Sequence, residues 1–206
     1  MITIILESVF LLLTVIVVAY LVRHYVFTLT VIKNANRRKE ATAPRNEAYQ
    51  PSVSVLIPAR NESCVIGRIL RRMTELTYPK SKLQVIVVDD GSTDSTGKMV
   101  EQYARDFEYI EVVSRSQEQG GHGKPAALNA GTKYVRNEIV LCFDADYYPQ
   151  RDIIEKLVAK FADPKVGAVQ GRVTVLNEPR NLVTRLVALE RIVDTELIRR
   201  HEMNLN

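Results

Sequence analysis

The segment Leu83–Val88 (LQVIVV), followed at once by Asp89-Asp90-Gly91-Ser92-Thr93-Asp94, decides the fold of this 206-residue chain. An apolar, β-branched run of this length predicts a buried strand, and the acidic and small residues after it predict a turn into a helix. Similar runs, each followed by polar residues, occur at Ser52–Ile57 and Glu138–Phe143. Because strands of this kind alternate with helical patterns, the sequence predicts an α/β fold with a doubly wound, mostly parallel sheet.

Helical spacing of apolar residues predicts the elements between the strands. Asn61 or Ser63 is expected to cap the first of these helices, and Ser92 or Thr93 the second. The predicted helices span Asn61–Leu76, Thr93–Phe107, Ala126–Val135, Arg151–Phe161 and Asn181–His201, and further strands are predicted at Tyr109–Val113 and Val166–Val175.

Two aspartates directly follow the strand predicted at Glu138–Phe143. Asp144 and Asp146 are two positions apart, so in an extended chain their carboxylates point to the same side. Paired carboxylates with phosphate oxygens and water suit a hard divalent cation such as Mg²⁺ or Mn²⁺. Since ligands of doubly wound sheets bind at the carboxyl ends of the strands, this position predicts a binding site.

Two other polar clusters are expected at the same edge of the sheet. Asp89 and Asp90 end one strand, where a carboxylate could accept hydrogen bonds from a base or ribose; the alternative is an ordinary turn that Gly91 permits. The loop Gly120–Lys124 leads directly into a predicted helix, which favours a diphosphate contact for Lys124, with a solvated loop lysine as the alternative.

Several other functions are excluded by missing patterns. Gly123-Lys124 is followed by Pro125, so the loop is not a P-loop, and neither G-x-G-x-x-G after the first strand nor G-x-S-x-G occurs.

Residues 1–45 carry six basic and two acidic side chains, so the net charge of +4 lies there and the rest of the chain is neutral. We therefore expect no nucleic-acid partner. Cys64 and Cys142 are predicted to be small buried residues rather than metal ligands.

The N-terminus is predicted to cross a membrane. Ile2–Val22 holds one charged residue, Glu7, and is long enough to span the hydrocarbon core. The basic residues all follow the apolar run, which predicts a single-pass anchor with the rest of the chain in the cytoplasm. Residues 1–32 are thus expected to form the anchor. Residues 33–51 would be a basic juxtamembrane linker able to contact membrane lipid.

Four segments, SVLIPARNE, VIVVDDGSTD, GKPAALNAG and VLCFDADYYP, together resemble the family 2 inverting glycosyltransferases of GT-A fold. The resemblance covers about residues 52–206 and is greatest to the membrane synthases of cellulose, chitin, hyaluronan and poly-N-acetylglucosamine. It implies transfer of a sugar, with inversion, from a nucleotide diphosphate donor to a growing glycan or lipid-linked acceptor. UDP-glucose or UDP-N-acetylglucosamine is the implied donor, with Mg²⁺ or Mn²⁺ as cofactor.

The resemblance also implies roles for individual residues. Asp90, with Asp89, would hold uracil, while Lys124 would contact the diphosphate. Asp144 would meet the ribose or the metal, and Asp146 would be the principal metal ligand. The residues implied to lie beside the nucleoside are Pro58, Arg60 and Glu62, although the family often has Tyr where this chain has Arg60.

The catalytic base of the family is not matched within these residues and is expected beyond Asn206. On this basis, residues 52–206 are interpreted as a donor-binding domain that lacks the acceptor half, and the chain alone is expected to transfer little sugar. Two alternatives stay open. One is a non-catalytic nucleotide-sugar-binding remnant or subunit, and the other is a polyprenyl-phosphate glycosyltransferase.

Overall fold

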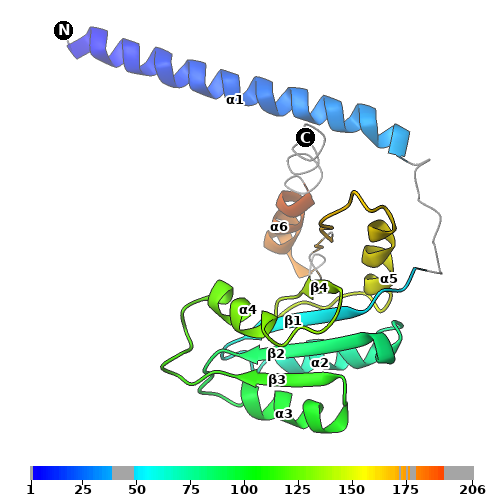
Figure 1. The fold of residues 1–206 in the computed structure, drawn as a ribbon. Helices are drawn as coiled ribbons and strands as arrows, with labels where there is room; N and C mark the ends of the chain where they lie inside the picture. The colour runs from blue at the N-terminus through cyan, green and yellow to red at the C-terminus, as the bar shows by residue number, and fades with distance from the viewer. Residues whose placement is uncertain (1, 39–48, 172, 175, 177–179, 193–206) are drawn as a thin grey trace. The chain divides into compact units, whose positions relative to one another are not determined.

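A computed structural model describes residues 2–38, 49–171, 173, 174, 176 and 180–192 of the chain (Figure 1). The chain divides into two compact units. One is formed by Arg45–Gln170 and contains the sheet, and the other is formed by Met1–Pro44 and Gly171–Asn206.

The N-terminal helix α1 spans Ile2–Arg38. Its segment Thr3–Val26 is long and apolar enough to cross a membrane, as the sequence predicts. The helix also includes the first six residues of the segment predicted to be a linker. Lys33–Arg38 contains no Gly or Pro, so the helix begun by the apolar run can continue through it.

Four parallel strands form the sheet of the larger unit, in the order β3-β2-β1-β4. They are β1 (Val53–Ala59), β2 (Leu83–Asp89), β3 (Ile110–Ser114) and β4 (Ile139–Cys142). β1 and β2 are buried along nearly their whole length, which explains their continuous apolar runs. The predicted doubly wound, parallel α/β sheet is therefore confirmed.

Helices cover both faces of this sheet. Alternate residues of β1 and β2 pack with helices α2, α3 and α5 on one face, where Ile69 and Val100 are fully buried. The remaining residues, including Leu56 and Ile86, pack against α4 on the other face. The bounds of these helices are α2 Ile66–Glu75, α3 Thr96–Asp106, α4 Lys124–Thr132 and α5 Ile153–Val158, with short 3-10 helices η1 at Lys80–Lys82 and η2 at Ala159–Ala162.

The expected caps of α2 and α3 are wrong. α2 begins five residues later than predicted, with Val65 at its N-cap position and no side-chain cap. Asn61 instead has a positive φ of 54°, a conformation that Asn tolerates better than most residues. At α3, Asp94 accepts hydrogen bonds from the backbone nitrogen and hydroxyl of Thr96. Asn61 and Asp94 thus belong to the loops between strands and helices.

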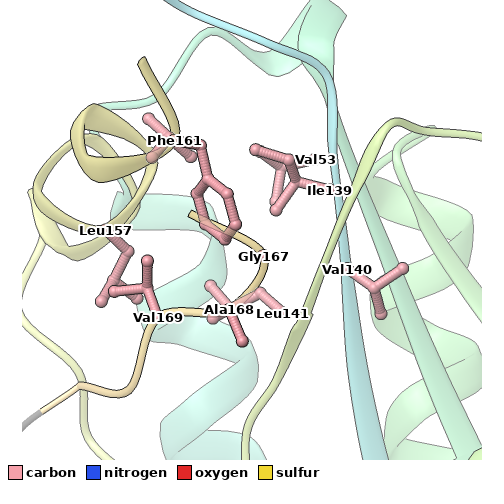
Figure 2. Close-up of a pocket in the computed structure, with 10 residues that line it drawn as sticks. Val53, Ile139, Val140, Leu141, Leu157, Phe161, Gly167, Ala168 and Val169 are labelled. Atoms are coloured by element: carbon pink, nitrogen blue, oxygen red, sulfur yellow. The ribbon is translucent and has the colours of Figure 1, made fainter. Parts of the chain in front are cut away.

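The strand predicted at Val166–Val175 is also wrong, because none of the described residues in this range is in a strand. Gly167–Val169 and the β4 residues Ile139–Leu141 line an apolar cavity of about 160 Å³ (Figure 2). An alternating pattern shows which side chains face the core, but a strand also needs a neighbour that pairs its backbone. Here the segment and β4 share the lining of a cavity without a ladder.

The sequence also predicts a C-terminal helix and two buried cysteines. Helix α6 spans Leu182–Ile192, which confirms the start of the predicted C-terminal helix, and residues 193–206 lie outside the described part. Cys64 and Cys142 are exposed rather than buried. Cys64 lies in the loop before α2, and Cys142 ends β4, where alternate residues are open to solvent.

The cavity leads to a stability prediction. A Cβ added to Gly167 meets no described atom within 4 Å, and the backbone there is not in the positive-φ region. We expect Gly167→Ala to stabilise the fold by about 0.5–1 kcal/mol, because alanine restricts the unfolded chain. In Gly131→Ala the new Cβ would lie 2.7 Å from Val88 Cγ2, so this control should destabilise by about 1–3 kcal/mol. Thermal unfolding of both variants measures the difference, and equal melting temperatures would contradict the prediction.

Candidate functional site

The strand order of the sheet reverses between β1 and β4. The chain proceeds outward from β1 through β2 to β3 and then returns to β4 on the other side of β1. Ligands of open parallel sheets bind at such a reversal of strand order. The loops that follow β1, β2, β3 and β4 therefore carry the candidate site, and each of them contains or leads into residues predicted from the sequence.

The loops after β1 and β2 are joined by hydrogen bonds. Asn61 donates its backbone N–H to Ser92 Oγ (3.0 Å) and accepts from the Thr93 N–H through its side-chain oxygen (2.8 Å). Asp94 accepts from the Ser63 N–H and from Thr96, and the hydrogen bonds from Thr96 are the main reason that the pKa of Asp94 lies below its usual value. The two loops thus fix each other.

Asp89 and Asp90 have different surroundings although they are adjacent. Asp89 accepts a hydrogen bond from the Ser92 N–H (3.1 Å), and a Cβ on Gly97 would lie 2.5 Å from its Oδ2. Its carboxylate is therefore used by the turn into α3. Asp90 is 4% exposed and accepts from the Gly121 N–H (2.9 Å), so it ties the end of β2 to the loop Gly120–Gly123, called here the glycine loop. Asp90 is therefore better placed than Asp89 to contact a ligand that binds beside the glycine loop.

Arg115, which directly follows β3, is a member of the site that the sequence analysis missed. Its guanidinium forms an ion pair with Asp90 and donates a hydrogen bond to the Gln119 carbonyl oxygen. The side chain of Arg115 is 15% exposed and that of Asp90 is 6% exposed, so the pair is largely shielded from water. A basic residue two positions after the third predicted strand, Tyr109–Val113, was the signal that could have identified it.

The glycine loop approaches both Asp90 and Arg60 closely. A Cβ on Gly120 would lie 2.3 Å from the Asp90 carbonyl oxygen, and one on Gly121 would lie 1.7 Å from Arg60 Nη1. Gly121 also has a φ of +77°, which favours glycine. The structure thus brings Arg60 and Asp90 together around the loop.

Pro58 lies within β1, and Glu62 lies in the loop that follows this strand. Pro58 is a half-buried residue of β1, paired in register with Val88 of β2. Glu62 donates its N–H to Thr96 Oγ1 (2.8 Å), and its carbonyl oxygen accepts from the Ile66 N–H at the start of α2. Glu62 therefore shapes the loop after β1, whereas Pro58 lies within the strand, and the predicted contacts of both with a nucleoside stay predictions.

Lys124 and Asp144 are brought together although they are 20 residues apart. Lys124 opens helix α4, and its ammonium forms an ion pair with Asp144, which follows β4. The hydrogen bond that Lys124 donates to the Asp144 carboxylate is the main cause of the raised pKa of Lys124, so the amine stays protonated at neutral pH. The side chains are 52% and 37% exposed, respectively, so the pair is open to a ligand from solvent.

Asp146 is exposed, two residues further along the same loop. Its backbone carbonyl accepts a hydrogen bond from Arg68 Nη2 of α2 (2.7 Å). Within the described residues, no hydrogen bond or ion pair engages its carboxylate. The loop is therefore anchored through its backbone while this carboxylate stays available.

The donor set fits a divalent cation bound together with a phosphate ligand. Asp144 and Asp146 offer hard oxygen atoms from one loop, and no group of three or more His, Cys, Asp or Glu that could hold a metal occurs in the described part of the chain. A cation held by one or two carboxylates, with phosphate oxygens and water as its other ligands, is the usual mode for Mg²⁺. The residues present fit that mode.

Comparison with known proteins agrees with this geometry. A family model described as glycosyl transferase family 2 matches residues 54–204. The probable glycosyltransferase YdaM of Bacillus subtilis is 37% identical over 171 residues, which are 82% of this chain and 39% of that protein. The beta-monoglucosyldiacylglycerol synthase of Synechocystis is 36% identical over 144 residues, 70% of this chain and 30% of that protein. The chain thus spans less than half the length of these relatives.

A solved structure shares the fold. The mannosyltransferase PcManGT of Pyrobaculum calidifontis, in complex with GDP-Man and Mn²⁺, superimposes with a TM-score of 0.62 at 32% identity. The match covers 82% of this chain and 48% of the mannosyltransferase. The similarity supports a GT-A arrangement of the strands and helices described above.

Proposed function

Because the chain belongs to glycosyl transferase family 2, a family of enzymes, we propose that it binds a nucleoside-diphosphate sugar at the carboxyl ends of its strands and serves inverting transfer of the sugar to a growing glycan. The observation that carries the proposal is the Lys124–Asp144 ion pair, which lies beside Asp146 at the reversal of strand order. It combines a cation for phosphate with carboxylates for a metal.

The diphosphate and the metal are proposed to bind at this ion pair. Lys124, at the start of α4, contributes a protonated amine to the diphosphate, while Asp144 and Asp146 hold Mn²⁺ or Mg²⁺. The bound metal supplies Lewis-acid stabilisation of the negative charge that develops on the departing nucleotide.

The nucleoside is proposed to bind between the loops after β1 and β2. Asp90, shielded and held by Arg115 and Gly121, would accept hydrogen bonds from the base, with Arg60 and Pro58 beside it. Asp89 and Glu62 act in this proposal by fixing the loops. Uracil is the proposed base, so UDP-glucose and UDP-N-acetylglucosamine are the proposed donors. The second candidate is a guanine nucleotide, which the complex of the similar mannosyltransferase with GDP-Man favours.

The acceptor and the membrane arrangement are also part of the proposal. We place residues 52–206 in the cytoplasm, behind a single-pass anchor at residues 1–32 and a basic linker at 33–51 that contacts lipid headgroups. A lipid acceptor is the second candidate after a growing glycan, because a relative is a beta-monoglucosyldiacylglycerol synthase and α1 is suited to a membrane. The base that activates the acceptor is not assigned to any residue of this chain.

Calorimetric titration of the detergent-solubilised chain tests the donor. We expect saturable binding of UDP with Mn²⁺ that falls to weak residual binding when EDTA removes the metal. GDP titrated in parallel is expected to bind at least tenfold more weakly, a difference of about 1.4 kcal/mol. Tighter binding of GDP would reverse the assignment of the base, and no binding of either nucleotide would contradict the proposed function.

A further inference from the structure

Helix α2 contacts the loop after β4 through a row of polar side chains. Arg68 Nη2 donates to the Asp146 carbonyl oxygen (2.7 Å), and the Arg72 guanidinium lies over the Tyr148 ring at 4.0 Å. One turn further, Glu75 forms an ion pair with Arg151 (3.4 Å). Positions 68, 72 and 75 are spaced by four and three residues, so they lie along one face of the helix.

The middle of this row is shielded from solvent. The side chain of Arg72 is 11% exposed and forms an ion pair with Glu75 (3.0 Å). Its stacking over Tyr148 is a cation–π contact at short range. The loop therefore rests on a helix face over several residues rather than at a single point.

The opposite side of α2 makes this a rigid support. Ile66, Ile69, Leu70 and Met73 are all fully buried in the core under the sheet. Close packing of this kind leaves a helix little freedom to shift. A backbone atom held by a side chain of α2 is consequently held relative to β1 and β2, which carry the nucleoside side of the site.

We infer that Arg68 is a positioning residue, which holds the Asp146 backbone so that the Asp144 and Asp146 carboxylates face one cation, with Arg72 supporting it through Tyr148. The inference rests on the proposed function, because it assigns Arg68 to the metal-dependent part of donor binding. Arg68 itself contacts the carbonyl oxygen and not the carboxylate of Asp146. Its effect on the cation is thus indirect.

The test compares Arg68→Gln with Arg68→Lys and with Arg71→Gln in the full, detergent-solubilised chain. Arg71 is exposed on the same helix, and Arg71→Gln removes the same charge, so it is the matched control. We expect Arg68→Gln to raise amide hydrogen exchange in residues 144–148. It should also weaken Mn²⁺-dependent UDP binding by roughly tenfold, which is the lower end of the effect of losing a residue that orients a metal ligand. Arg68→Lys should restore part of the affinity, and melting temperatures should stay within about 2 °C of each other, as for other surface changes.

The outcomes separate the inference from the proposed function. Unchanged exchange in residues 144–148, or wild-type affinity in Arg68→Gln, would overturn the role of Arg68 while the donor assignment stands. An equal loss in Arg71→Gln would show a general effect of charge and would also overturn it. A wild-type chain that binds no UDP with Mn²⁺ would overturn the proposed function, and with it the role of Arg68 in donor binding.

Discussion

Replacement of Asp146 by Asn is expected to weaken UDP binding in the presence of Mn²⁺ by more than about 100-fold. Changes to residues that only surround a metal ligand weaken binding by up to about 100-fold, and the loss of a ligand itself should cost more. The exposed carboxylate of Asp146 has no hydrogen bond or ion pair within the described residues, so the substitution should leave the fold intact. Asn keeps one oxygen of similar position but loses the negative charge that a hard cation requires. The loss is measured by calorimetric titration with UDP at fixed Mn²⁺.

The control for this experiment is Asp106→Asn. Asp106 is exposed at the end of α3 and is not part of the proposed site, so its replacement changes the net charge equally without touching the loop after β4. We expect wild-type affinity from this control. If Asp146→Asn binds UDP with Mn²⁺ as tightly as Asp106→Asn does, the metal is not held at this loop, and Asp144 alone cannot sustain the proposal.

Residual binding in EDTA gives a second measure. Contacts of the nucleoside with Asp90 and its neighbours do not depend on the metal, so weak binding without Mn²⁺ should be the same in Asp146→Asn and in the wild type. In contrast, Asp90→Asn should weaken UDP binding both with Mn²⁺ and in EDTA. It also removes a shielded ion pair with Arg115, so its melting temperature has to be compared before its affinity is interpreted.

The strands could be predicted from the sequence because their signal is local. Buried parallel strands need continuous β-branched runs, and both Ser52–Ile57 and Leu83–Val88 have them. The carboxylates that follow the strands could be predicted for the same reason, since the end of a run fixes where a loop begins. Val166–Val175 shows the limit of this reasoning, because its pattern resembles a strand but pairing depends on a neighbour that the pattern does not contain.

The contacts that complete the site could not be predicted in the same way. Arg115 meets Asp90 across 25 residues, and Arg68 meets Asp146 across 78. Such pairs depend on the order of strands in the sheet, which brings β2 beside β3 and places α2 near the end of β4. A single charged residue within a helix, such as Arg68, carries no local mark of its partner, because most such residues are simply solvated.

Deletion of residues 1–32 is expected to move the chain from the membrane fraction to the soluble fraction. Thr3–Val26 is an apolar segment of 24 residues within helix α1. At about 1.5 Å per residue it reaches about 36 Å, more than the roughly 30 Å of a hydrocarbon core. The full chain should therefore resist extraction by high salt and by alkaline carbonate, and the deleted chain should not be retained.

A second variant separates loss of the apolar run from loss of length. Leu12→Arg with Val15→Arg keeps every residue of the chain but places two charges near the middle of the span, at a cost of about 2.5–3.5 kcal/mol each. If α1 anchors the chain, both variants should appear in the supernatant after carbonate extraction.

Retention of the deleted chain would instead point to α6, where Leu182, Val183 and Leu186 are exposed on a helix that also carries Arg185. A helix with exposed apolar and basic side chains can bind at the surface of an anionic membrane, so high salt would then weaken the retention, whereas a spanning helix is insensitive to salt.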